Sequence, residues 1–211
     1  MKFRKSLRSP ELSALPAVFR RPKHFQSKPL RCIYMGSSSK TLAPCLRLGF
    51  LVAPKALYPK LLQAKQTADL HTPSFNQRIL SEVLKGGFLE LDVPTIRALY
   101  KSQRDAMLAA FSHEMPAGVT WNKPGGGMFL WVRLPEGMNA VTLLPKAVQK
   151  NMAFVPGAAF CPDNADPRCL RLSFVTASAE QIKFGVAALA DAIRVSRQVL
   201  AGKEPAMMEA T

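Results

Sequence analysis

A short glycine- and serine-rich segment, Gly36–Gly49, gathers residue types that can bind an anion and bond to a carbonyl compound. Its small residues let the backbone approach a ligand closely, and its successive hydroxyls, Ser37–Ser39, can donate to phosphate oxygens. Arg47 adds a planar charged fork that suits a phosphate dianion. Lys40 can form an imine with an aldehyde cofactor. The spacing of a Walker A loop is absent. Spacing alone therefore indicates an anion site with a nearby lysine, or else an exposed turn with a solvated lysine.

The elements expected around this segment are short strands and amphipathic helices. Strands are predicted at Arg31–Met35 and Leu46–Val52, on either side of the loop. Three helices should follow: one with Pro54 in its first turn, one from Pro73–Ser74 to Gly86–Gly87, and a longer one that starts near Val93–Pro94. The first of these helices should place Leu57, Leu61 and Leu62 on one face. The pattern is that of part of an α/β layer.

From Pro116 onward the pattern changes to a mixture of strands and helices. Strands are predicted at Phe129–Leu134, Met152–Val155 and Leu170–Val175. Asn139 should cap a helix that runs to about Gln149. Ser178 with Gln181 forms a capping box for a last helix, whose buried face should hold Ile182, Val186, Leu189 and Ile193.

The net charge of +15 is unevenly distributed along the chain. The first 31 residues hold nine basic residues against one acid, whereas the remainder holds twenty basic and thirteen acidic residues. An organellar transit peptide or a nucleic-acid-binding arm would both account for the basic segment. We favour a poorly ordered flank or a displaced start site, because the segment has four prolines and no helical period. Nucleic acid is therefore not an expected partner.

Two further classes of protein are disfavoured by the composition. An uninterrupted apolar run of about 18 residues, as a membrane span requires, is absent. The four cysteines form no C-x-x-C pair and show no metal-ligand spacing with the three histidines. We therefore expect reduced thiols in a cytoplasmic protein, without a metal site.

The pattern S-x-S-K-T-x-x-P-x-L-R-x-G, carried by Ser37–Gly49, resembles the cofactor-lysine segment of class I/II pyridoxal-phosphate-dependent aminotransferases of fold type I. It is similar in particular to the branch with 2-aminoadipate, kynurenine and aromatic aminotransferases and the aminotransferase-like domains of MocR-type regulators. The resemblance covers roughly residues 30–195. It continues in order through Asp69–Pro73, Asn76–Gln77, Tyr100 with Arg104–Met107, Gly126–Trp131, Val155–Gly157 and Leu170–Phe174. Ser38 and Cys45 depart from the pattern.

The resemblance implies a role for five residues. Lys40 would form the Schiff base with pyridoxal 5'-phosphate and later move the substrate proton. Ser37, Ser39 and Arg47 would hold the cofactor phosphate, and Arg171 would clasp the substrate α-carboxylate with two hydrogen bonds. The substrates would be an amino acid and a 2-oxo acid, and the intact family works as a homodimer. His71 is expected to be a packed or capping residue rather than a catalyst.

The fold class implied is α/β: part of the large domain of a fold type I transferase, followed by its α+β small C-terminal domain. The groups that hold the cofactor ring in the family come from an N-terminal half that we expect this chain to lack. Two other functions stay open, namely the effector domain of a MocR-type transcription regulator and an inactive fragment. The expected segments are a basic flank (1–30), a large-domain remnant with the lysine (31–90), the small domain (91–200) and a tail (201–211).

Overall fold

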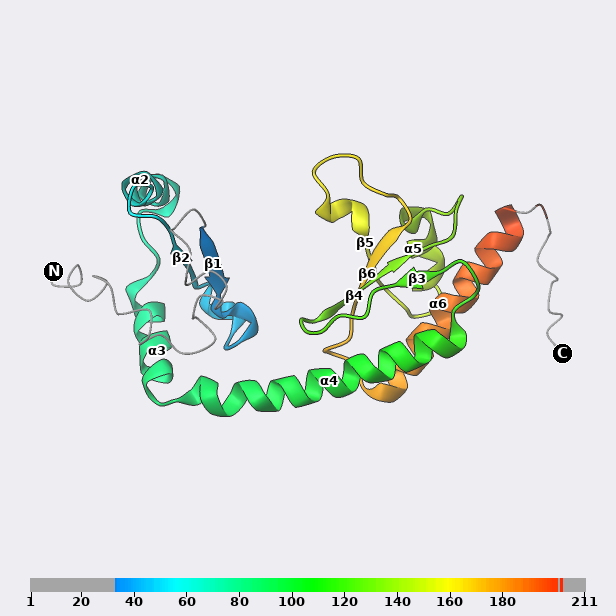
Figure 1. Cartoon of the computed structure of the whole chain (residues 1–211), viewed down its shortest axis with the longest axis horizontal. Helices are drawn as coiled ribbons and strands as arrows, with labels where there is room; N and C mark the ends of the chain where they lie inside the picture. The colour runs from blue at the N-terminus through cyan, green and yellow to red at the C-terminus, as the bar shows by residue number, and fades with distance from the viewer. Residues whose placement is uncertain (1–32, 201, 203–211) are drawn as a thin grey trace. The chain divides into compact units, whose positions relative to one another are not determined.

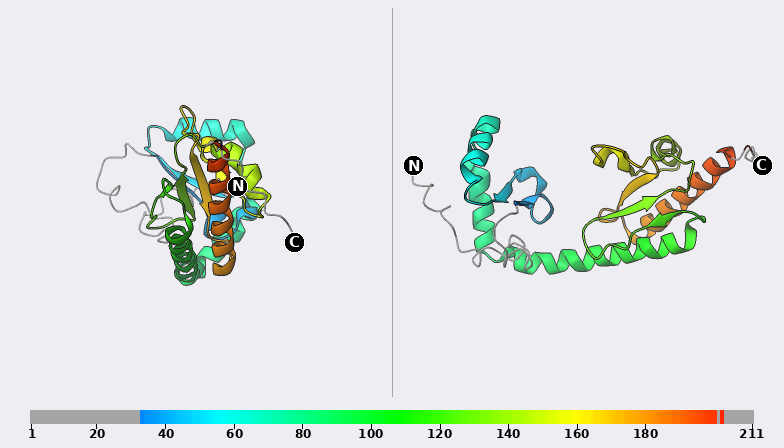
Figure 2. Two further views of the ribbon diagram at one scale, coloured as in Figure 1. Left: turned by 90° about the vertical axis from the view of Figure 1, so that its right-hand side faces the viewer. Right: turned by 45° about the horizontal axis from the view of Figure 1, so that its top comes forward.

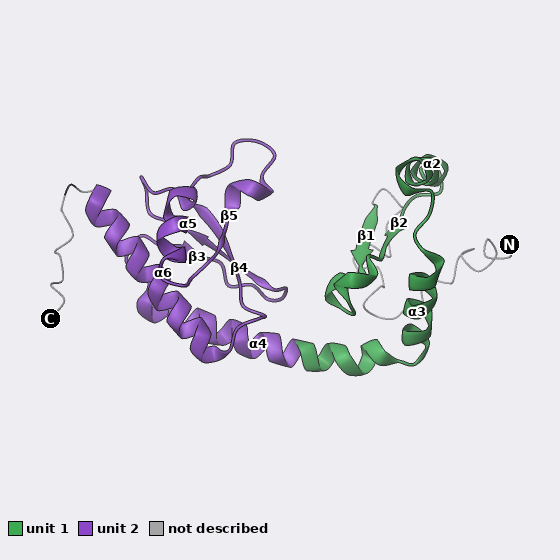
Figure 3. Cartoon of the chain, turned by 180° about the vertical axis from the view of Figure 1, so that it is seen from behind, with its two compact units in different colours: residues 1–96 green, residues 97–211 purple. Residues whose placement is uncertain are grey.

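The computed structural model of the chain describes residues 33–200 and Gly202 (Figure 1). The basic flank, the tail except Gly202, and the first two residues of the strand expected at Arg31–Met35 lie outside the described residues. The chain divides into two compact units, Met1–Ile96 and Arg97–Thr211, within a helix that contributes to both (Figure 3). Each unit is described by itself below.

The strands of unit 1 are β1 (Tyr34–Ser37) and β2 (Gly49–Val52), and they pair antiparallel. Two short 3-10 helices, η4 (Ser38–Lys40) and η5 (Pro44–Leu46), connect them. The prediction that a strand would start at Leu46 was wrong. Arg47 has a left-handed backbone with φ of 51°, which is outside the β region, so β2 begins only at Gly49.

Helices α2 (Tyr58–Asp69) and α3 (Ser74–Lys85) follow β2. The first starts later than expected, with Pro59 rather than Pro54 in its first turn, and none of its residues is buried. Leu57 and Leu62 are 44% and 38% exposed, so the predicted leucine face is largely open in the described chain. The second helix ends at its expected glycine cap, Gly86.

Helix α4 (Phe88–Glu114) begins before Pro94, not at it as the sequence indicated. Proline cannot donate the backbone hydrogen bond that would reach the carbonyl four residues earlier, Glu90, so one bond of the helix is missing. Leu89, in the turn before the proline, is only 2% exposed. Burial of this leucine offsets the lost hydrogen bond and extends the helix toward its N-terminus.

Unit 2 contains a four-stranded antiparallel sheet in the order β3-β4-β6-β5. Strand β3 has only two residues and was not predicted. The expected Met152–Val155 strand is displaced, because only its last residue enters β5. The bounds are β3 Thr120–Trp121, β4 Phe129–Arg133, β5 Val155–Pro156 and β6 Cys169–Ser173.

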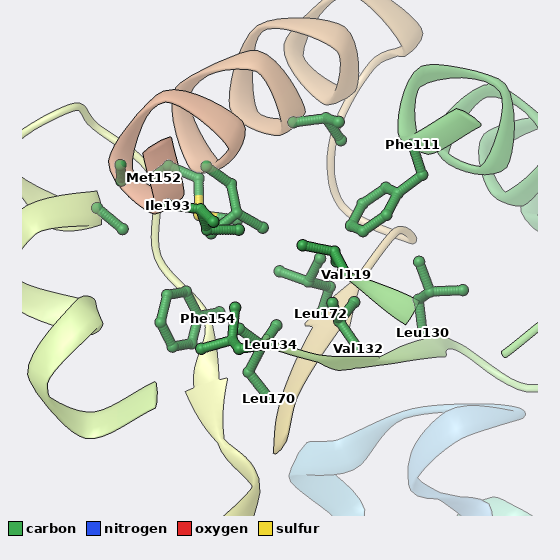
Figure 4. Close-up of a cluster of buried hydrophobic side chains, with 14 of the residues drawn as sticks. Phe111, Val119, Leu130, Val132, Leu134, Met152, Phe154, Leu170, Leu172 and Ile193 are labelled. Atoms are coloured by element: carbon green, nitrogen blue, oxygen red, sulfur yellow. The ribbon is translucent and has the colours of Figure 1, made fainter. Parts of the chain in front are cut away.

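The core of unit 2 lies between one face of this sheet and its helices (Figures 2 and 4). Alternate residues of β4 and β6 point into it, because strand side chains alternate between faces. Helix α4 contributes Phe111, which is fully buried. The sheet contributes Leu130, Val132, Leu170 and Leu172. The other residues of the two strands, among them Trp131 and Arg171, therefore belong to the opposite face of the sheet.

The two helix starts predicted in this unit are confirmed. The Asn139 side chain accepts a hydrogen bond from the Val141 N–H at the start of α5 (Ala140–Val148). Ser178 and Gln181 form both bonds of the capping box before α6 (Ala179–Leu200). The apolar face predicted for the last helix is buried as expected: Ile182, Val186, Leu189 and Ile193.

Candidate functional site

Ser38 fixes the conformation of the loop that carries the candidate lysine. Its backbone N–H and its hydroxyl both donate to the Leu48 carbonyl, at 3.1 Å and 3.0 Å, and the residue is 2% exposed. This hydroxyl is therefore turned into the protein. Of the three successive hydroxyls that could donate to a phosphate, that of Ser38 is not available, because it ties the start of the loop to its end.

The hydroxyls of Ser37 and Ser39 lie next to each other on the exposed side of the same turn. Ser37 Oγ accepts from the Ser39 N–H at 3.1 Å and donates to Ser39 Oγ at 2.9 Å. Ser37 is the N-cap of the 3-10 helix that ends at Lys40. Because the two hydroxyls are neighbours, a single bound anion could accept hydrogen bonds from both.

Gly36 permits the tight crossing beneath this turn. A Cβ atom built on it would lie 2.2 Å from the Phe50 ring, a separation that real Cβ atoms do not show. Phe50 is the residue of β2 that pairs with Gly36 in the sheet register. Any larger residue at this position would therefore require the Phe50 ring to move.

Arg47 stands on the other side of the loop, in the left-handed conformation described above. Its guanidinium is exposed and donates to the Pro44 carbonyl at 3.4 Å. The neighbouring Leu46 carbonyl accepts from Asn76 Nδ2 of α3 at 3.1 Å. A helix from later in the sequence therefore anchors the part of the loop that presents the arginine.

Lys40 is exposed and forms no hydrogen bond or ion pair with any residue in the described part of the chain. The Oγ1 atom of Thr41 beside it is buried without a hydrogen-bond partner among these residues. The whole Gly36–Gly49 loop contains no acidic residue. Two paired hydroxyls, a guanidinium and an uncommitted amine form a donor set that fits a phosphate and an aldehyde. Pyridoxal phosphate carries both groups.

Arg171 is placed in unit 2, on the face of β6 that points away from the helices. Its Cζ lies 4.0 Å from the Phe129 ring centroid and 3.9 Å from that of Phe160, so the guanidinium packs against two aromatic rings. The guanidinium makes no hydrogen bond or ion pair with another residue of the described chain. Its N–H donors, which lie in the guanidinium plane, are thus uncommitted.

The turn that brings Phe160 to Arg171 depends on Gly157. Strand β5 pairs with β6 and runs directly into η6 (Gly157–Phe160). A Cβ atom on Gly157 would lie 2.7 Å from Cys169 Cβ and 2.9 Å from the Cys169 carbonyl oxygen. The glycine therefore allows η6 to lie directly against the central strand.

An ion-pair cluster holds the loop before β6. Asp166 pairs with Arg168 and with Arg133 of β4. Hydrogen bonds from the Arg168 side chain and backbone, together with the Arg133 guanidinium, hold the pKa of the Asp166 carboxyl well below its usual range. Burial raises the pKa of the nearby Cys169 thiol, which leaves that thiol protonated at neutral pH.

The remaining candidate features give little support for a further site. His71, which the sequence suggested to be a packed or capping residue, is exposed, and its Nδ1 lies 3.2 Å from the Thr72 carbonyl. Within the described residues, no group of three or more His, Cys, Asp and Glu side chains could hold a metal ion. In that part of the chain no helix is long and apolar enough to cross a membrane.

Sequence reasoning named neither Phe129 nor Phe160 as a site residue. A signal for Phe160 existed in its spacing after Pro156-Gly157, but only the strand pairing shows that this turn reaches Arg171. The inward direction of Ser38 had no signal in the sequence, because a buried and an exposed serine look alike.

Comparison with known proteins finds that this chain is similar to aminotransferases. The chain is 44% identical over 164 residues to an aromatic-amino-acid aminotransferase of Thermococcus litoralis, covering 78% of this chain and 39% of the relative. It matches the crystal structure of the α-aminoadipate aminotransferase LysN of Thermus thermophilus, complexed with N-(5'-phosphopyridoxyl)-L-leucine, with a TM-score of 0.74 and 43% identity. That match covers 79% of this chain and 43% of LysN.

An HTH-type transcriptional regulator of Bacillus subtilis is 30% identical over 154 residues, covering 73% of this chain and 32% of the regulator. No protein-family model matches the chain. The chain spans about two-fifths of the length of the curated aminotransferases it matches.

Proposed function

We propose, from the premise that the chain belongs to the fold type I pyridoxal-phosphate-dependent aminotransferases, that it takes part in amino-group transfer between an amino acid and a 2-oxo acid. The observation that carries the proposal is that one acid-free loop holds an uncommitted lysine, two paired hydroxyls and an exposed guanidinium. Such a set suits one ligand that has both an aldehyde and a phosphate.

Each residue would have a distinct task. Ser37, Ser39 and Arg47 would bind the cofactor phosphate, and Lys40 would hold the cofactor covalently. Lys40 Nζ would then take the proton from the substrate α-carbon and return it on the other side of the exchange. Arg171 would bind the substrate α-carboxylate through its free in-plane donors. The bound cofactor would supply an electron sink for the charge that develops at the α-carbon.

The assembly and compartment are also proposals. A homodimer is supported by the large apolar side chains that unit 1 exposes, among them Met35, Leu70, Phe75 and Leu91, each more than 70% exposed. A cytoplasmic location is supported by the cysteines of the described chain, which are free thiols. Sedimentation of the purified chain would test the dimer.

Cofactor attachment tests the proposal directly. The full chain would be mixed with pyridoxal phosphate, followed by visible absorption, reduced with borohydride and digested for mass spectrometry. We expect the label at Lys40 and its loss in Lys40→Ala. Lys60→Ala, which removes an exposed lysine of α2, is the matched control and should label as the wild type does. Labels scattered over several lysines, or unaffected by Lys40→Ala, would refute the role of Lys40.

The regulator alternative is supported by the weaker match to the B. subtilis protein. Both readings use the same lysine, so labelling at Lys40 does not separate them. The genomic sequence upstream does: a winged-helix segment there would favour a regulator, and a large-domain half alone would favour an enzyme.

A further inference from the structure

The surroundings of Arg171 contain two aromatic side chains that no step of the proposed reaction uses. Phe129 comes from β4 and Phe160 from η6, and each ring lies within 4.0 Å of the guanidinium carbon. Trp131, the cross-strand partner of Arg171, packs its ring edge-to-face on Phe160, with centroids 5.5 Å apart and an interplanar angle of 81°. The aromatic residues therefore form one connected group around a single cation.

A guanidinium packed against two rings is constrained in a specific way. The two rings shield part of the guanidinium from solvent, whereas its N–H donors all lie in the guanidinium plane, at its edge. Contact with the rings also replaces the salt bridge that usually fixes an arginine, and none of the described residues provides such a partner. The positive charge of the guanidinium therefore remains available to an external anion, while the ring contacts restrict the movement of the side chain.

We propose that Phe129 and Phe160 are positioning residues that orient Arg171 for edge-on capture of a carboxylate. The inference rests on the proposed function, since it concerns the same arginine. It adds a role for Phe129 and Phe160, which have none in that function. Binding energy follows from alignment, because two parallel hydrogen bonds form only if the fork and the carboxylate share a plane. A freely rotating arginine would first have to lose that freedom.

Gly157 and Trp131 support the arrangement from behind. The glycine lets η6 lie directly against β6, as the short distances to Cys169 require, and the tryptophan packs edge-to-face on the Phe160 ring. Phe160 itself is 43% exposed and Trp131 is 37% exposed. Two large aromatic rings left this exposed beside a cation are explained by a ligand site better than by core packing.

The test uses binding by the full chain and needs no turnover. The protein would be labelled with nitrogen-15 in its arginines, and the Nε–H signal of Arg171 would be assigned by its loss in Arg171→Lys. In the wild type we expect this signal to be displaced upfield by the two rings, and to move on titration with 2-oxohexanoate. Hexan-2-one, which has a methyl group in place of the carboxylate, should leave it unmoved.

The variants distinguish the orienting effect of the two rings on Arg171 from a general effect of removing an aromatic side chain. Phe160→Leu and Phe129→Leu should each reduce the upfield displacement and weaken 2-oxohexanoate binding about three- to tenfold, the effect of losing one ring–cation contact. Phe160→Tyr retains a ring and should bind as the wild type does. Phe184→Leu is the matched control, since Phe184 is an exposed residue of α6 on the helix side of unit 2.

Several results would overturn the inference: affinity of Phe160→Leu within twofold of the wild type, an equal loss in Phe184→Leu, or a wild-type Arg171 signal that no carboxylate moves. These outcomes are independent of cofactor attachment. Labelling at Lys40 with no effect of the phenylalanine variants would refute only the inference, whereas scattered labelling with intact carboxylate binding would refute only the proposed function.

Discussion

Replacing Gly157 by alanine should destabilise unit 2. The added Cβ would meet Cys169 Cβ at 2.7 Å and the Cys169 carbonyl oxygen at 2.9 Å. These atoms cannot retreat easily, because Cys169 belongs to β6, which is paired on both sides by β4 and β5. Overpacking of this kind costs about 1–3 kcal/mol. Alanine also reduces the conformational entropy of the unfolded chain, which stabilises the folded state by about 0.4–1 kcal/mol. We expect a net loss of about 1–2 kcal/mol.

The assay is urea unfolding followed by tryptophan fluorescence. The chain has two tryptophans, Trp121 and Trp131, and both belong to unit 2, so the signal reports on this unit. The midpoint should fall while the slope of free energy against urea stays constant, because the surface exposed on unfolding is unchanged.

Gly185→Ala is the matched control for this prediction. It makes the same chemical change inside α6, where the nearest atom to the new Cβ would be Met152 Cγ at an ordinary 3.7 Å. Alanine is favoured over glycine in a helix by about 0.5–1 kcal/mol, so this variant should be as stable as the wild type or more so. If Gly157→Ala were equally stable, the argument that the glycine is required by close packing would be refuted.

Three further changes test other parts of the structure. Arg47→Ala should weaken pyridoxal phosphate binding about 10- to 100-fold, the effect of one charge-assisted hydrogen bond, whereas Arg97→Ala on α4 should not, as measured by absorption titration. Ser178→Ala should lower the urea stability of unit 2 by about 1 kcal/mol through loss of the α6 cap, and an unchanged midpoint would contradict that role. Because the pKa of Asp166 is depressed in the folded state by Arg168 and Arg133, its stabilising effect exists above the unfolded pKa of about 3.9 and is lost as the pH falls below it. Asp166→Asn should therefore be less stable than the wild type at pH 7 and converge with it in acid, and a difference that does not depend on pH would be evidence against the ion pairs.

The sequence by itself determined the features that depend on neighbouring residues. The caps at Asn139 and Ser178 were predictable because each acts on backbone groups within three residues of it. The loop around Lys40 was recognisable because its serines, lysine and arginine lie within one short segment of the sequence. The family followed from the order of several such segments, and comparison with solved structures agrees with the predicted fold class.

Only the tertiary structure decided the features that depend on residues distant in the chain. Strand β3 has two residues and exists because it pairs with β4, and α4 extends past Pro94 because Leu89 is buried. Ser38 turns inward because the Leu48 carbonyl is there to accept its bonds. The Arg171 guanidinium packs against rings from two other elements. Local propensity contains no information on these partners, since the folded chain brings them together only when the sheet forms.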